Sequence, residues 1–113
     1  MKRDPDLSRK ILFELEASDR WQFVIDTEGE ESKEREYHLE LLKDEGLLVS
    51  VGKYTYRMTS KGHDYLDAIR SDTVWNKTKE GAAKVGGMTL GMMKDLAIAY
   101  VKQEAAEKLG VKL

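Results

Sequence analysis

The residues that could contact a nucleic-acid backbone form a small set of lysines and arginines. Affinity for duplex DNA comes largely from neutralising phosphates with such side chains. The candidates lie around an expected β-hairpin and near the start of the chain: Lys53, Arg57, Lys61, Lys2, Arg3, Arg9 and Lys10. Basic clusters are weak signals, so the plainer interpretation as solvated charges stays open.

Acidic side chains dominate between residues 26 and 45, where nine acids stand against three bases. Residues 1–46 carry a net charge of −6, whereas residues 47–113 carry +4. An acidic face is unsuited to phosphates but can dock a basic protein, or it can simply be solvated. The candidate partner-binding residues are Glu34, Glu36, Glu40 and Asp44.

No set of residues in the sequence predicts catalysis or metal binding. His38 and His63 are the only histidines, and cysteine is absent. Neither histidine has a second histidine four residues on. His38 could meet Glu34 or Asp44 on its own helix as a ligand set, but we expect it to form structural hydrogen bonds instead. The glycine-rich residues 86–91 lack the lysine of a phosphate-binding loop and are better interpreted as a hinge. We therefore expect no enzyme activity, no cofactor and no small-molecule substrate.

Length and composition are typical of a single intracellular domain. A chain of 113 residues, 41% hydrophobic and 35% charged, can bury one core without disulfides. The absence of cysteine is compatible with a reducing cytosol. The first ten residues lack the apolar run of a signal peptide, and no stretch approaches the roughly 20 apolar residues that span a bilayer. These features predict a cytoplasmic protein that does not bind membranes.

The elements that must position the candidate residues follow from hydrophobic spacing and capping residues. Asp4-Pro5 is typical of a helix start, and Ser32 can cap a second helix that Gly46 closes. Gly52-Lys53 predicts a type II′ turn between two β-rich runs. The expected order is helix 5–17, strand 21–25, helix from 32 to about 45, strands 47–51 and 54–58, and a helix capped by Thr59 or Ser60.

The remaining residues predict further helices. The helix after residue 60 either breaks or continues around residues 71–73, and Trp75, Thr78, Ala82 and Val85 then line one helical face. Gly86-Gly87 should break that helix, and Thr89 should cap a last one that ends near residues 109–110.

The last helix carries a large apolar face for the end of a small domain. Such a stripe cannot show what it packs against, so packing on the chain's own core and self-association are both open. The candidate interface residues are Met92, Met93, Leu96 and Tyr100. Trp21 and Trp75 are interpreted first as core anchors and second as interface residues.

Two motifs resemble those of winged-helix repressors of the ArsR and MarR types. Residues 37–48, Tyr-His-Leu-Glu-Leu-Leu-Lys-Asp-Glu-Gly-Leu-Leu, are similar to the recognition-helix end that enters the wing. Residues 58–66, Met-Thr-Ser-Lys-Gly-His-Asp-Tyr-Leu, look like the segment that leaves it. Their order around a tight hairpin implies a winged helix.

Nearly the whole chain resembles a family of small uncharacterised phage and prophage proteins. The resemblance rests on residues 1–4, 6–7 and 9–12, on the Tyr-His-Leu segment of residues 37–48, on Gly62 to Arg70, and most specifically on Asp72-Thr73-Val74-Trp75-Asn76-Lys77-Thr78-Lys79. It implies a mobile-element context and carries no activity.

These observations predict an α+β fold. We expect a winged-helix domain over residues 1–70, with a reduced helix-turn-helix and a short hairpin wing, and a helical extension over residues 71–113. The predicted function is a non-enzymatic interaction module that binds a protein partner, itself, or both. The alternative is a DNA-binding regulator that uses the basic hairpin, because fold alone does not fix function.

Overall fold

The computed structural model describes residues 1–26, 28–86, 89–110 and 112. In these residues the chain is a mixed α+β protein with five helices and one three-stranded antiparallel sheet. It divides into two compact units, an N-terminal unit of Met1–Leu66 and a C-terminal unit of Asp67–Leu113, and the boundary falls inside helix α3. The expected hinge at residues 86–91 includes Gly87 and Met88, which lie outside the described residues.

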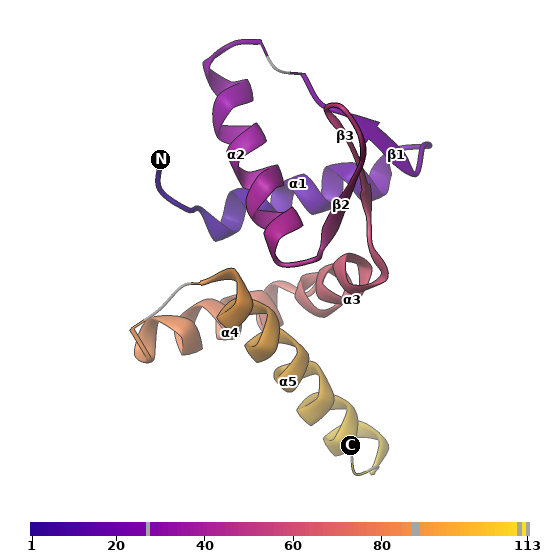
Figure 1. The fold of residues 1–113 in the computed structure, drawn as a ribbon. Coiled ribbons are helices and arrows are strands. Elements are labelled where there is room, and N and C mark those ends of the chain that lie inside the picture. The colour runs from indigo at the N-terminus through magenta and orange to yellow at the C-terminus, as the bar shows by residue number, and fades with distance from the viewer. Residues whose placement is uncertain (27, 87–88, 111, 113) are drawn as a thin grey trace. The chain divides into compact units, whose positions relative to one another are not determined.

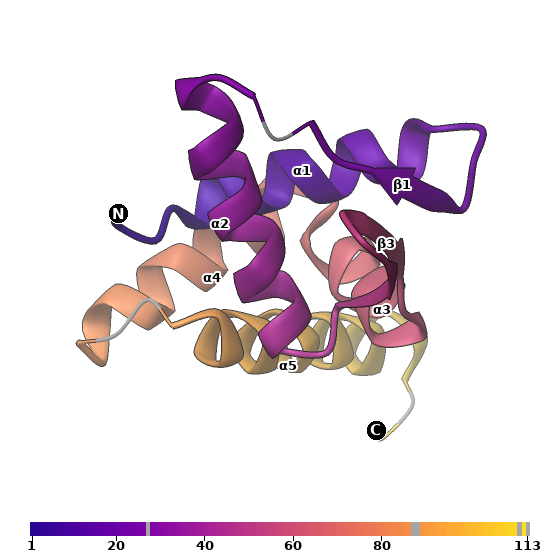
Figure 2. The ribbon, with the colours of Figure 1, turned by 45° about the horizontal axis from the view of Figure 1, so that its top comes forward.

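The N-terminal unit begins as the capping residues predict. Helix α1 spans Pro5–Ala17, and the Asp4 carboxylate accepts hydrogen bonds from the backbone N–H groups of Asp6 and Leu7 at 3.0 and 3.2 Å. Helix α2 spans Glu30–Asp44 and crosses α1 (Figures 1 and 2). The core of this unit consists mainly of hydrophobic side chains. They are Ile11, Leu12, Leu15, Leu39, Leu42, Leu47, Leu48, Tyr56, Met58, Tyr65 and Leu66.

The prediction that Ser32 caps the second helix is wrong. The N-cap lies three residues earlier, at Gly29, whose φ of 91° favours glycine. Ser32 lies inside the helix, where its hydroxyl donates to the carbonyl of Glu28. The early start places Glu30 and Glu31 in the first turn, where the helix dipole favours negative charge.

The sheet contains strands β1 (Gln22–Val24), β2 (Leu48–Gly52) and β3 (Thr55–Met58) in the order β1-β3-β2. The predicted turn is displaced by one residue. Strand β2 has an irregularity between Ser50 and Gly52, so Gly52 pairs with Thr55 and the turn residues become Lys53 and Tyr54. Tyr54, rather than Gly52, adopts the positive φ, at 56°.

One threonine holds the start of the helix that follows the hairpin. Thr59 accepts a hydrogen bond from the N–H of Gly62 at 3.0 Å and donates one to the carbonyl of Gly46 at 2.6 Å. It thereby caps helix α3, Ser60–Ile69, and joins it to the end of α2. Of the two caps that the sequence allowed, the structure shows Thr59.

The C-terminal unit contains helices α4 (Asp72–Lys84) and α5 (Leu90–Leu109). Ser71 lies between α3 and α4, and its hydroxyl caps α4 by accepting from the N–H of Val74 at 3.4 Å. Of the two alternatives that the sequence left open, a break and a continuous helix, the structure shows the break. Thr89 caps α5 as predicted. Trp75, Thr78 and Ala82 are buried as expected, whereas Val85 is 65% exposed beyond the end of α4.

Helices α4 and α5 pack closely at one glycine. A Cβ atom on Gly81 would lie 2.6 Å from the hydroxyl oxygen of Tyr100 and 3.4 Å from a methyl carbon of Leu96. Two of the four candidate interface residues therefore pack against α4 within their own unit.

Two buried tyrosines give a testable pH dependence. Burial raises the pKa of Tyr65 above its usual 10.0, and burial together with a hydrogen bond to the Glu40 carboxylate raises that of Tyr56. Because the unfolded chain ionises first, stability is retained below pH 10 and falls as the pH rises above it. Each tyrosine contributes a slope of up to about 1.4 kcal/mol per pH unit. Urea unfolding across alkaline pH should show this loss, and Tyr65→Phe should flatten it; an unchanged slope would contradict the assignment.

Candidate functional site

The outward face of α2 is acidic because its three bases are ion-paired. Lys33 lies 3.6 Å from Glu30, and Lys43 lies 3.5 Å from Glu40. Arg35 lies 2.6 Å from Glu14 of α1. Exposed pairs of this kind contribute little stability, but each places a carboxylate beside a cation that could otherwise meet a phosphate.

The four predicted acidic residues lie on this one helix, but not in equivalent surroundings. Glu34 and Asp44 are exposed, and Glu36 is half-buried. These three form no ion pair within the part of the chain that the structure describes. Glu40 differs, because it pairs with Lys43 and accepts a hydrogen bond from the hydroxyl of the buried Tyr56. Glu40 therefore links α2 to β3, and the other three carboxylates are available to a partner.

The predicted nucleic-acid contacts do not form one patch. Lys53 lies at the hairpin turn, 5.4 Å from the Tyr54 ring centroid, and Lys61 is exposed in the first turn of α3. Arg57 is half-buried on β3. The hairpin and the first turn of α3 thus present one exposed lysine each, and the hairpin adds a partly covered arginine.

The N-terminal bases lie away from this group. Lys2 and Arg3 line a hollow together with Glu30, Glu31 and Glu34. Arg9 lies over the Phe13 ring, 5.0 Å from its centroid, and Lys10 is exposed on α1. Two of these four bases therefore lie beside the acidic start of α2, which reduces their attraction for phosphate.

His38 forms the structural hydrogen bonds that the sequence predicts. Its side chain is fully buried, Nε2 accepts from the N–H of Asp4 at 2.9 Å, and Nδ1 lies 2.8 Å from the carbonyl oxygen of Glu34. Since Nε2 accepts, the proton must be on Nδ1, which donates to Glu34. The imidazole thus ties the N-cap of α1 to α2.

Replacing His38 with phenylalanine should leave these two backbone groups without their partners. We expect the free energy of unfolding to fall by about 2 kcal/mol, because an unsatisfied buried polar group costs roughly 1–3 kcal/mol. Urea denaturation measures the change. His63→Phe is the matched control, since His63 is exposed; equal losses in both variants would refute this role of His38.

The predicted interface residues of α5 differ in exposure. Met92 is 37% exposed, Met93 is fully buried, and Leu96 and Tyr100 are half-buried. Val101, also 37% exposed, is a further apolar side chain on this helix.

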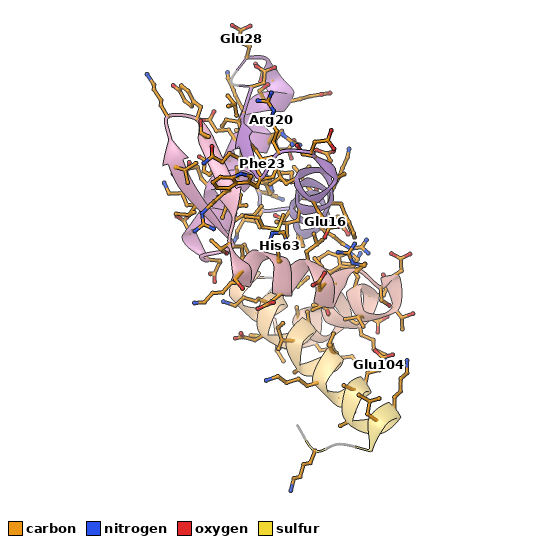
Figure 3. The ribbon with its side chains drawn as sticks, turned by 90° about the vertical axis from the view of Figure 1, so that its right-hand side faces the viewer. Glu16, Arg20, Phe23, Glu28, His63 and Glu104 are labelled. Atoms are coloured by element: carbon orange, nitrogen blue, oxygen red, sulfur yellow. The ribbon has the colours of Figure 1, made fainter. Side chains whose placement is uncertain are left out.

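A pocket of about 360 Å³ in the N-terminal unit was not predicted from the sequence. Residues of α1 and the following loop form one wall: Leu15, Glu16, Ser18, Asp19, Arg20 and Trp21. Phe23 of β1, Arg57 and Met58 of β3 and His63 of α3 form the other. Figure 3 shows Glu16 near His63, with Phe23 and then Arg20 lying farther toward Glu28.

The expectation that Trp21 is a core anchor is wrong, whereas it holds for Trp75. Trp21 is 70% exposed at the rim of the pocket, and Trp75 is 3% exposed. Strand β1 begins only at Gln22, so Trp21 lies in the preceding loop and does not follow the alternation of the strand. The helix end at Ala17, followed by a polar loop, was the sequence signal for this exposure.

The described residues contain no group of three or more histidine, aspartate or glutamate side chains placed to hold a metal ion. Within the same ranges, no helix is both long and apolar enough to cross a membrane.

Comparison with known proteins places the chain in a family. No solved structure matches it. A protein of Haemophilus influenzae, described as "Uncharacterized protein", is 33% identical to it over 94% of this chain and all of the relative. A family model described as "Hypothetical protein (DUF2513)" matches residues 2–89. The chain therefore belongs to the DUF2513 family.

Proposed function

We propose that this protein is a non-enzymatic interaction module, and that the acidic face of α2 binds a basic surface on a partner protein. The observation that carries the proposal is the ion pairing of all three bases on α2. It leaves the carboxylates of Glu34, Glu36 and Asp44 to dominate the face. Complementary charge steers association and discriminates between partners, so such a face selects a basic one.

The core of the module is proposed to be a winged helix. The elements follow the order α1, β1, α2, β2, β3, α3, and the sheet order is β1-β3-β2. In that fold α2 takes the place of the recognition helix and the β2–β3 hairpin that of the wing. The resemblance of residues 37–48 and 58–66 to winged-helix repressors supports the same assignment.

The origin, the cellular location and the self-association of the module are also proposed. The resemblance of Asp72–Lys79 to phage and prophage proteins supports a mobile-element origin, and the absence of cysteine supports the cytoplasm. Exposed Met92 and Val101 on α5 support self-association, because methionine adapts to irregular surfaces.

Duplex DNA binding through the hairpin is the second candidate. Exposed Lys53 and Lys61 favour it, since both lie at or beside the wing position. The half-buried state of Arg57 and the acidic surroundings of Lys2 and Arg3 weigh against it.

Affinity capture with quantitative mass spectrometry tests the primary proposal. The test variant carries Glu34→Lys, Glu36→Lys and Asp44→Lys, and Glu40 is kept because it bonds Tyr56. The matched control carries the same charge change at three exposed acids elsewhere, Asp64→Lys, Glu80→Lys and Asp95→Lys. We expect a basic partner to be retained by the wild type and the control and lost by the test variant. Equal retention by all three proteins would overturn the proposal.

A further inference from the structure

The pocket at the end of α1 combines an apolar interior with an exposed aromatic rim. Leu15 and Met58 are 6% and 7% exposed, and Phe23 is half-buried beside them. Trp21 at the rim keeps 70% of its surface in water, which is costly for the largest apolar side chain. A volume of about 360 Å³ is in the range of small-molecule sites. The pocket therefore has the size and the surfaces to hold a flat ring.

Three side-chain donors of the pocket have few or no hydrogen-bond partners in the part of the chain that the structure describes. Among the described residues, the side chains of Arg20 and His63 form no hydrogen bond or ion pair, and Arg57 makes only a long contact of 3.5 Å with the carbonyl of Met58. A guanidinium group matches the geometry of a phosphate or carboxylate. Arg20 comes from a loop, Arg57 from a strand and His63 from a helix, and all three line the same pocket.

The pocket also carries acceptors. Glu16 and Asp19 lie at the end of α1 and in the loop that follows, and both are exposed. Their two negative charges balance those of Arg20 and Arg57. A charge-balanced pocket is a poor groove for a continuous phosphate backbone, which needs an excess of bases. It suits a ligand that carries one anionic group together with hydroxyl or amino donors.

We propose that this pocket binds a nucleotide, with the base stacked on Trp21 and the phosphate held by Arg20 and Arg57. The carboxylate of Asp19 then accepts from sugar hydroxyls or from the amino groups of the base. This site is separate from the acidic face of α2 and does not depend on the proposed partner binding. A free mononucleotide and the terminal nucleotide of a single strand share this chemistry.

Tryptophan fluorescence of the full chain tests the proposal, because only Trp21 of the two tryptophans is exposed. The probes are AMP, GMP, CMP and UMP, and a 5′-phosphorylated tetranucleotide of each base. We expect saturable quenching by at least one probe, and the same binding site should be seen by calorimetry. Trp21→Ala should weaken the calorimetric binding about tenfold or more, as loss of a base–aromatic stack does. A mononucleotide that binds as tightly as its tetranucleotide identifies a free ligand, and a clear gain for the tetranucleotide identifies a strand end.

Matched variants separate the pocket from the rest of the surface. Arg57→Gln should weaken binding about tenfold, whereas Arg70→Gln, an exposed arginine outside the pocket, should leave it unchanged. Circular dichroism checks that each variant is folded. Affinities weaker than about 1 mM for every probe would overturn the proposal. Binding that survives both Trp21→Ala and Arg57→Gln would overturn it as well.

Discussion

Replacing Gly62 with alanine is expected to destabilise the protein by about 3 kcal/mol, near the upper end of overpacking substitutions. The added Cβ would overlap the carbonyl oxygen of Leu47 and lie 2.7 Å from Cγ of Met58. The Met58 side chain can move, but the Leu47 carbonyl is backbone and accepts the N–H of Thr59 at 3.0 Å. The clash must therefore displace α3 or break that hydrogen bond. Urea denaturation monitored by circular dichroism measures the loss.

Gly52→Ala is the control for this substitution. A Cβ at Gly52 would meet only Thr55, at 3.6 Å, which is ordinary contact, and its φ is not in the left-handed region. We expect a change within about 0.5 kcal/mol. Comparable stabilities for Gly62→Ala and Gly52→Ala would show that the approach of α3 to Leu47 is not as close as described.

Reversing three carboxylates on α2 is expected to create duplex binding. Glu34→Lys, Glu36→Lys and Asp44→Lys change the net charge from −2 to +4 and leave the ion-paired bases of the same helix in place. If α2 is the recognition helix of a winged helix, these lysines face the phosphates of a docked duplex. We expect affinity at low salt to rise at least about 100-fold, with a strong salt dependence. Fluorescence anisotropy of a labelled random-sequence duplex measures it.

The variant with the same charge change elsewhere, Asp64→Lys, Glu80→Lys and Asp95→Lys, distinguishes position from net charge. It should bind the duplex more weakly than the α2 variant at every salt concentration. Equal affinities would mean that net charge alone attracts the duplex, and the assignment of α2 to the recognition position would lose its support.

Local capping chemistry explains why much of the fold was predictable. Asp4, Thr59 and Thr89 each cap the helix that the sequence assigned to them. Their side-chain oxygens accept from backbone N–H groups of the first turn, which have no partner within the helix. The Thr-x-x-Gly spacing of Thr59 and Gly62 has a physical basis in the structure. Thr59 caps α3 and bonds Gly46, and the missing Cβ of Gly62 allows α3 to approach Leu47.

The errors arise where tertiary context outweighs local pattern. Serine is a good N-cap residue, yet the helix already begins after Gly29, so Ser32 lies inside it. The irregularity at Ser50–Gly52 moves the hairpin turn by one residue, which a turn motif alone does not show. Trp21 fits the apolar alternation of residues 21–25 in the sequence, but strand β1 begins only at Gln22, so Trp21 lies in the loop before it. The pocket was missed for a related reason, since Arg20, Arg57 and His63 are far apart in the sequence and meet only in the folded unit.

The central claim is that α2 presents an acidic face that binds a protein partner and not duplex DNA. Its most direct test is the fluorescence anisotropy of a labelled random-sequence duplex titrated with the wild-type protein at low and moderate salt. We predict no binding at either salt concentration, because α2, the proposed recognition helix, is acidic and its bases are paired. Binding that falls steeply with salt and is lost in Lys53→Glu with Arg57→Glu would contradict the claim. It would show that the hairpin makes this protein a DNA-binding regulator.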